Sequence, residues 1–233
     1  MENNLNNLNS EKLFNNKLGL NEKEYFDNLS NINKEEYSYQ NECISLDIPR
    51  TTKNKEIFKN LEEILKVFSI TNGGLGYISG MSFIVKELLE LTNNDKIKSY
   101  IIMRNIFENQ DLRNLYDNHH QNIMNKLELK FKEKMPLLFQ HFKKNNIPII
   151  IISINLLKTL FCFEFDENIA KELLKIFIVK NDFNLYLNAF LAILKINEEE
   201  LLKKNNEEIL LLINNYKTCE VNKYFEIIKK ISE

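Results

Sequence analysis

Glycine is scarce in this sequence of 233 residues, with five in total and none after Gly80. Four of the five are Gly73, Gly74, Gly76 and Gly80, and all four fall within the stretch TNGGLGYISGM, residues 71–81. Tryptophan is absent altogether. A chain that concentrates its scarcest backbone-permissive residue in one place raises the question of whether this stretch is a phosphate-binding loop, a plain turn or part of a functional site.

Several protein classes are excluded by what else is missing. The three cysteines, Cys43, Cys162 and Cys219, share no spacing typical of a metal site and cannot all pair, which favours a reducing compartment. The 31 basic and 33 acidic residues nearly balance, without the positive excess expected of a nucleic-acid-binding protein. Residues 1–20 lack the apolar core of a secretory signal. We therefore expect a cytoplasmic protein that does not bind nucleic acid.

Long apolar runs are also few, and the most apolar stretch is IPIIIISINLLKTLFCFEF, residues 147–165. It admits two interpretations, a membrane span or a helix buried on all sides. Asn155 and Lys158 interrupt it and leave apolar runs too short to cross a bilayer. The buried helix is therefore favoured, and no transmembrane segment is expected.

Apolar residues with helical spacing cover the chain from Thr52 onward. Pro136 and Pro148 stand where helices would begin. No stretch alternates in the manner of a strand, so the sequence predicts an all-α fold of about ten short helices. We expect the Asn- and Lys-rich residues 1–24 to be disordered and residues 25–233 to form a single helical domain. The expected stripes are 57–68, 81–89, 95–108, 111–132, 136–145, 148–164, 167–179, 183–196, 206–215 and 219–231.

The glycine-rich stretch does not fit a nucleotide-binding loop. A Walker-type loop needs lysine and a hydroxyl directly after its last glycine, but Gly80 precedes Met81, and Lys86 is too far away. A dinucleotide-binding loop needs a parallel sheet, which is not expected here. The alternative is a turn between helices in which Ser79 caps the next helix. A plain turn does not account for the aromatic Tyr77 within it.

A second stretch of interest is CISLDIPRTT, residues 43–52. Pro49 disfavours helical backbone at Ile48, which predicts a rigid loop at this point. Thr51 or Thr52 would then cap the helix that follows.

Arg50 would lie in that loop, with Asp47 three residues earlier and able to brace its guanidinium group. An arginine presented by a stiff loop suits a phosphate on another molecule. The alternative interpretation is a local surface ion pair of little consequence.

The two stretches together carry a family resemblance. Residues 44–51 fit the pattern Ile-x-x-Asp-x-x-Arg-Thr, and residues 76–81, GYISGM, are similar to Gly-Tyr-x-Gln-Gly-Met. In this order and separation they resemble the TBC-domain family of GTPase-activating proteins for Rab GTPases. The segments 135–147, 155–165 and 188–195 resemble further blocks of that family. The resemblance runs from about residue 25 to the C-terminus and agrees with a helical fold.

The resemblance implies a Rab-family GTPase as partner and Arg50 as an arginine finger that assists GTP hydrolysis in trans. Asp47 would orient Arg50. GTP and Mg²⁺ would belong to the partner, so no cofactor or metal of the chain's own is expected. The remaining partner-binding residues that the resemblance implies are Tyr77, Gly76, Gly80 and Thr51.

The sequence departs from the family at Ser79, where the family has a glutamine that acts as a second finger and orients the attacking water. A serine hydroxyl is too short to take that role. Either the target GTPase uses its own glutamine and Arg50 alone assists, or the domain is a catalytically weak module that chiefly binds Rab proteins. In both cases recruitment to endomembranes would go through the GTPase. An unrelated helical scaffold remains if the pairing of motifs is coincidental.

Overall fold

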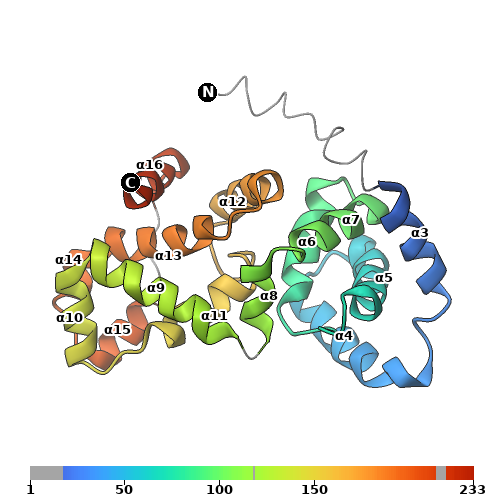
Figure 1. The fold of residues 1–233 in the computed structure, drawn as a ribbon, viewed down its shortest axis with the longest axis horizontal. Coiled ribbons are helices and arrows are strands. Elements are labelled where there is room, and N and C mark those ends of the chain that lie inside the picture. The colour runs from blue at the N-terminus through green and yellow to red at the C-terminus, as the bar shows by residue number, and fades with distance from the viewer. Residues whose placement is uncertain (1–17, 118, 214–218) are drawn as a thin grey trace. The chain divides into compact units, whose positions relative to one another are not determined.

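The computed structural model describes residues 18–117, 119–213 and 219–233 (Figure 1). Within these residues the regular structure comprises fourteen α-helices and one short 3-10 helix, with no strand. The all-α expectation is confirmed. The expected number of helices was low, partly because the stripe over 111–132 is divided into α8 (Gln110–Tyr116) and α9 (His120–Lys134).

The first described helix, α3 (Leu18–Leu29), begins inside the segment expected to be disordered. Residues 18–24 are therefore helical, which corrects that expectation for this part of the segment, while residues 1–17 lie outside the described residues. The described helices form two compact units, divided between Phe107 and Glu108. A single domain over 25–233 stays a prediction.

The first unit is built around α5 (Lys55–Thr71), which contacts α3 and three further helices (Figure 1). These are α4 (Ser38–Thr51), α6 (Met81–Leu91) and α7 (Lys96–Ile106). The apolar stripe expected on α5 is buried along its whole length, from Ile57 to Phe68. Asn54 precedes α5, and its side chain accepts a hydrogen bond from the backbone N–H of Glu56, which satisfies one free donor at the helix start. The short 3-10 helix η1 (Glu35–Tyr37) also belongs to this unit and directly precedes α4.

The second unit has α13 (Asn184–Ile196) at its centre, and every residue from 186 to 194 is buried. The amphipathic helix α16 (Val221–Ser232) packs against it, and the Tyr224 hydroxyl donates to the Ala189 carbonyl at 2.6 Å. The other helices of this unit, besides α8 and α9, are α10 (Pro136–Lys144), α11 (Ile149–Lys158), α12 (Glu167–Lys180), α14 (Glu198–Leu201) and α15 (Asn206–Ile213).

The apolar stretch 147–165 does not form one helix buried on all sides, so that expectation is wrong. α11 ends at Lys158, and Ile151 within it is 60% exposed. Leu160 and Phe161 then adopt positive φ and turn the chain. Among the described residues, none of the helices combines the length and apolar character that a bilayer crossing requires.

Asparagine takes over the backbone role that glycine usually fills in the glycine-free part of the chain. Asn93, Asn94, Asn146 and Asn181 all have φ between 50° and 63°. Asparagine is one of the few side chains that visits the left-handed region at low cost. Asn181 does so as the C-cap of α12, where glycine is the commonest choice. The high asparagine content therefore contributes directly to the turns of this fold.

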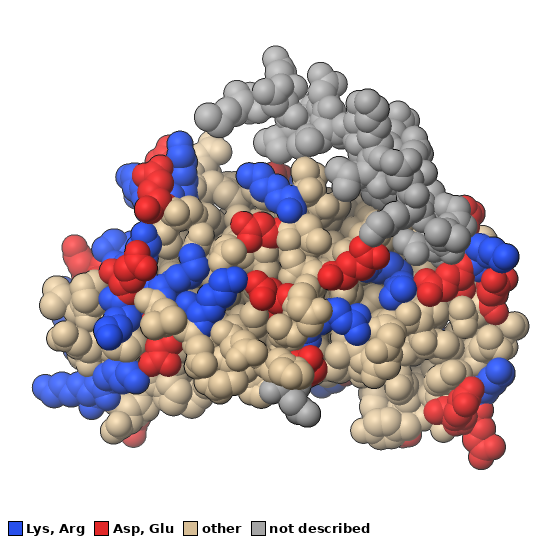
Figure 2. Space-filling model, viewed as in Figure 1, with Lys and Arg blue, Asp and Glu red and all other residues tan. Residues whose placement is uncertain are grey.

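The surface carries both signs of charge. On the face seen in Figure 2, lysine and arginine side chains are interspersed with aspartate and glutamate. This distribution matches the near-zero net charge of the sequence.

Candidate functional site

The end of α4 corrects the loop expected around Pro49. The helix continues through Pro49, and Arg50 lies in its last turn. Proline cannot donate to the carbonyl of Ser45 four residues earlier. Because Ser45 and Pro49 are both exposed, that carbonyl lies on the solvent side of the helix, where water can satisfy it. α4 ends at Thr51. The C-cap residue Thr52 has extended backbone, with φ of −152°.

The capping role expected of Thr51 or Thr52 is also wrong, because Asn54 caps α5. Thr52 lies two residues before this cap, and its hydroxyl accepts a hydrogen bond from the Asn54 N–H at 3.1 Å. Thr51 is buried, and its hydroxyl oxygen lies 2.7 Å from that of Ser82 on α6. Thr51 therefore joins the end of α4 to the start of α6.

The glycine-rich loop is held in place by the side-chain amides of buried Asn72 and half-buried Gln40. The Asn72 side chain, 1% exposed, donates to the Gly76 carbonyl at 2.7 Å and accepts from the Gly76 N–H at 2.9 Å. Gly76 has φ of 70°, and a Cβ atom there would lie 2.8 Å from Nε2 of Gln40. The Oε1 atom of Gln40 in turn accepts from the Tyr77 N–H at 3.0 Å. Any side chain at position 76 would therefore push away the side-chain amide of Gln40 on α4.

The start of α6 corrects the cap expected at Ser79. Gly80 is the N-cap, with φ of 103° in the left-handed region and no side-chain capping bond. The chain reaches it by a turn in which the Met81 N–H donates to the Ile78 carbonyl at 3.2 Å. Ser79 is exposed beside this turn, so its side chain faces solvent rather than the helix end.

Asp47 connects the two stretches that the sequence singled out. One carboxylate oxygen accepts from the Arg50 guanidinium, and the other accepts from the Tyr77 hydroxyl at 2.6 Å. The Asp47 side chain is only 8% exposed, whereas that of Arg50 is 69% exposed. The carboxylate is therefore fixed by Tyr77 of the glycine-rich loop, and it holds the guanidinium of Arg50, which faces solvent.

The hydroxyl of Tyr77 remains protonated at neutral pH. Burial raises the pKa of Tyr77 to about 12, although a hydrogen bond with Ser82 and the positive charge of Arg50 act in the opposite direction. A neutral phenol keeps the proton that it donates to Asp47.

All the predicted site residues belong to the first unit, and Asp47 contacts both Arg50 and Tyr77. Arg50 and Ser79 are exposed, Tyr77 is half-buried, and the other four are buried. Direct contact between the buried residues and a partner stays a prediction, and their visible role is to shape the site. The buried members of the predicted set are Asp47, Thr51, Gly76 and Gly80.

Sequence reasoning missed three residues that build the site, namely Gln40, Asn72 and Ser82. A signal for Gln40 does exist, because it lies on the same α4 face as Asp47 and Thr51, at helical spacings of seven and eleven residues. Asn72 directly precedes the paired glycines, which is a common turn position. Nothing in the pattern distinguishes Ser82.

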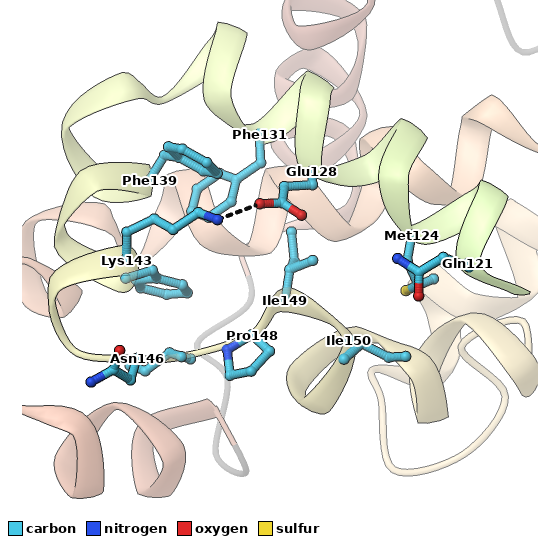
Figure 3. Close-up of a pocket in the computed structure, with 12 residues that line it drawn as sticks. Gln121, Met124, Glu128, Phe131, Phe139, Lys143, Asn146, Pro148, Ile149 and Ile150 are labelled. Atoms are coloured by element: carbon cyan, nitrogen blue, oxygen red, sulfur yellow. Dashed lines mark ion pairs between the residues drawn. The ribbon is translucent and has the colours of Figure 1, made fainter.

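The second unit contains a hollow of about 350 Å³ between α9, α10 and the start of α11 (Figure 3). Its lining is mostly apolar, and the ion pair of Lys143 with Glu128, at 2.9 Å, lies beside it. Within residues 18–117, 119–213 and 219–233, no group of three or more His, Cys, Asp or Glu side chains is placed to hold a metal ion. The only acidic and basic side chains among the residues that line the hollow are those of Glu128 and Lys143.

Comparison with known sequences places this geometry in a family context. A family model of the Rab-GTPase-TBC domain matches residues 4–202. TBC1 domain family member 14 of Rattus norvegicus is 31% identical over 170 residues, 69% of this chain and 24% of that protein. The Caenorhabditis elegans protein named Rab GTPase-activating protein eat-17 is 28% identical over 153 residues, 61% of this chain and 17% of that protein. The chain spans about a quarter or less of the length of these relatives.

Solved structures agree on the fold. The Chlamydomonas flagellar RabGAP TBC domain superposes with a TM-score of 0.77 over 97% of this chain and 76% of its own, at 17% identity. The Ypt/Rab-GAP domain of Gyp1p gives 0.76 over 93% and 79%, also at 17% identity. Because the family model covers most of the sequence and the helical fold is shared, the chain belongs to the RabGAP-TBC family.

Proposed function

We propose that this protein is a GTPase-activating protein for Rab-type small GTPases, and that Arg50 is the arginine finger it supplies in trans. The observation that carries the proposal is the contrast between the buried, doubly hydrogen-bonded Asp47 and the exposed Arg50 that it holds. A guanidinium that is oriented on one side and open on the other is suited to reach into another molecule's nucleotide site.

The mechanism follows from the charge that develops during phosphoryl transfer. Negative charge on the phosphoryl oxygens is poorly neutralised in a GTPase that acts alone, and an arginine finger accelerates hydrolysis by about 10³ to 10⁵. That range corresponds to roughly 4–7 kcal/mol of transition-state stabilisation. Asp47 orients Arg50 through one N–H and leaves the other guanidinium donors for these oxygens. In this proposal GTP and Mg²⁺ are bound by the partner, and the chain needs no cofactor of its own.

A second candidate function is a Rab-binding module with weak or no catalytic activity, and Ser79 is the observation that favours it. Ser79 is exposed at the position of the family's glutamine finger, but its hydroxyl lacks the reach and the paired donor and acceptor of a carboxamide. In both candidates the protein acts in the cytoplasm, and the GTPase brings it to endomembranes.

Single-turnover GTP hydrolysis across a panel of Rab proteins tests the leading proposal. We expect wild type to accelerate at least one Rab, and both Arg50→Ala and Arg50→Lys to lose most of that acceleration, because lysine lacks the planar fork. Lys53→Ala, which removes an exposed positive charge close to the site, is the matched control and should keep full activity. An Arg50→Ala variant as active as wild type refutes the finger.

The variant Ser79→Gln tests whether the site lacks only its second finger. If the site is intact apart from its second finger, the longer amide should raise the hydrolysis rate of a bound Rab at least tenfold, and Arg50→Ala should abolish the gain. Ser79→Asn, one methylene shorter, is the control for reach. An unchanged rate with Ser79→Gln indicates that the GTPase supplies its own glutamine or that the domain only binds.

A further inference from the structure

One side of α4 carries large exposed residues in line with Arg50. The exposed fractions are 76% for Tyr39, 65% for Leu46 and 69% for the Arg50 side chain. Half-buried Cys43 lies between Tyr39 and Leu46, so the spacings along the helix are four, three and four residues. At 100° per residue these four positions fall within a narrow stripe on one side of the helix. We refer to Tyr39, Cys43, Leu46 and Arg50 as the α4 ridge.

The α4 ridge runs beside the glycine-rich loop. Gln40 and Asp47 each follow a ridge residue by one position, and both accept a hydrogen bond from Tyr77. Gln40 accepts from the Tyr77 backbone N–H, and Asp47 accepts from the Tyr77 hydroxyl. The ridge therefore lies on the helix against which the glycine-rich loop, with its exposed Ser79, is held.

We propose that the α4 ridge is the surface on which a GTP-loaded Rab protein docks, with Leu46 as its apolar anchor. This inference rests on the proposed function. If Arg50 reaches the phosphates of a bound nucleotide, the same side of α4 must face the protein surface around that nucleotide. Leu46 lies about 6 Å and Tyr39 about 16 Å from Arg50 along the helix axis.

The ridge also defines the chemistry of the matching surface. An exposed leucine one helical turn from a charged finger stabilises a complex only if the partner offers an apolar depression at that distance from its nucleotide. Tyr39, further out, combines an apolar ring with a hydroxyl, which suits the wetter rim of an interface. The ridge residues follow the spacing of three and four positions at which helices commonly present anchor side chains to a groove on a partner. We therefore infer that Leu46 and Tyr39 select among Rab proteins, whereas Arg50 acts on the nucleotide they have in common.

The test compares Leu46→Ser with Leu129→Ser, which removes an equally exposed leucine, 68% exposed, from the second unit. Both residues are exposed, so both variants should keep the wild-type circular dichroism spectrum. Hydrolysis is measured at increasing concentrations of each protein against its best Rab. We expect Leu46→Ser to raise the half-saturating concentration about tenfold with little change in the rate at saturation. Tyr39→Ala should raise it about threefold, and Leu129→Ser should not change it.

Each outcome supports or overturns the inference. Arg50→Ala should show the opposite pattern, a lower rate at saturation with nearly normal half-saturation, which separates docking from catalysis. If wild type accelerates a Rab and Leu46→Ser is indistinguishable from Leu129→Ser, the docking inference fails and the proposed function stands.

Direct binding covers the case of an inactive domain. Titration of wild type with a Rab loaded with a non-hydrolysable GTP analogue should give an affinity that Leu46→Ser weakens about tenfold, even if no hydrolysis is stimulated. If wild type neither binds nor accelerates any Rab, both proposals are refuted. If sedimentation shows a dimer that Leu46→Ser dissociates while Rab affinity is unchanged, the ridge is a self-association surface and the inference is wrong.

Discussion

At the scale of single residues, Asp47 decides how Arg50 is presented. An exposed Asp–Arg pair is worth little because both partners are solvated and mobile. Here the carboxylate is buried and shares its second oxygen with Tyr77, so only the guanidinium end of the pair is free to move. This geometry favours a presented arginine over an incidental surface pair.

The variant Tyr77→Phe tests this arrangement. It removes the hydroxyl and leaves one oxygen of a buried carboxylate without its partner, which should cost about 1–3 kcal/mol of unfolding free energy. Arg50 would then be less well oriented, and the rate at saturation with Rab should fall, though by less than with Arg50→Ala. Denaturant unfolding and single-turnover hydrolysis measure the two effects.

The matched control for stability is Tyr39→Phe, which removes a hydroxyl from a largely exposed ring on α4, the helix that carries Asp47. It should change the unfolding free energy by a few tenths of a kcal/mol at most. If Tyr77→Phe is as stable as this control and as active as wild type, the hydrogen bond to Asp47 does not position the finger.

At this scale the sequence predicted the chemistry of the site better than its geometry. The spacing of Asp47 and Arg50 is sufficient to predict their ion pair, because residues three apart are neighbours on a helix and can also meet in a turn. The clamp of Asn72 on Gly76 depends on how the loop closes on itself, and the contact of Gln40 with Tyr77 joins residues thirty-seven positions apart. A local pattern can place Gln40 on the same helix face as Asp47, but it does not show that Gln40 contacts Tyr77.

At the scale of elements, proline and glycine were interpreted by rules that tertiary structure modified. Pro49 was expected to lie in a rigid loop, yet α4 continues through it and loses only one hydrogen bond, on the exposed side of its final turns. Ser79 was expected to cap α6, yet the left-handed turn at Gly80 sets that boundary. Most of the expected helix stripes do correspond to helices, because burial of one face determines the positions of apolar residues. The exceptions are the stripe over 111–132, which is divided into α8 and α9, and the stripe over 148–164, where α11 ends at Lys158.

The glycine-rich loop gives a prediction with an internal control. Gly74 and Gly76 both have positive φ, but a Cβ atom at Gly74 meets no atom within 4 Å, whereas one at Gly76 meets Gln40. Gly74→Ala should cost about 1–2 kcal/mol of unfolding free energy from backbone strain alone. Gly76→Ala should cost more, and should also reduce hydrolysis, because displacement of Gln40 breaks its hydrogen bond to Tyr77.

A double-mutant cycle isolates the clash. In a Gln40→Ala background, Gly76→Ala should cost no more than Gly74→Ala, because the crowding side chain has been removed. If the excess cost of Gly76→Ala persists in that background, contact with Gln40 does not explain why glycine occupies this position.

At the scale of the whole molecule, the site residues all belong to the first unit, while the family match extends over both. The sequence predicted the helical class, but not the division into two units or the central position of α13. The stripe over 183–196 predicts the helix itself, but a stripe marks one buried face and does not reveal that α13 is buried at nine consecutive positions. Which helices meet is decided by long-range packing that a local pattern does not record.

The central claim is that Arg50 stabilises the charge of a phosphoryl group in transfer on another protein's nucleotide. Its most direct test is complex formation with a Rab protein loaded with GDP and aluminium fluoride, which mimics that group at the transition state. The account predicts a stable complex with wild type by size-exclusion chromatography, loss of that complex with Arg50→Ala, and retention with Lys53→Ala. A complex that forms equally well without the Arg50 guanidinium would contradict it.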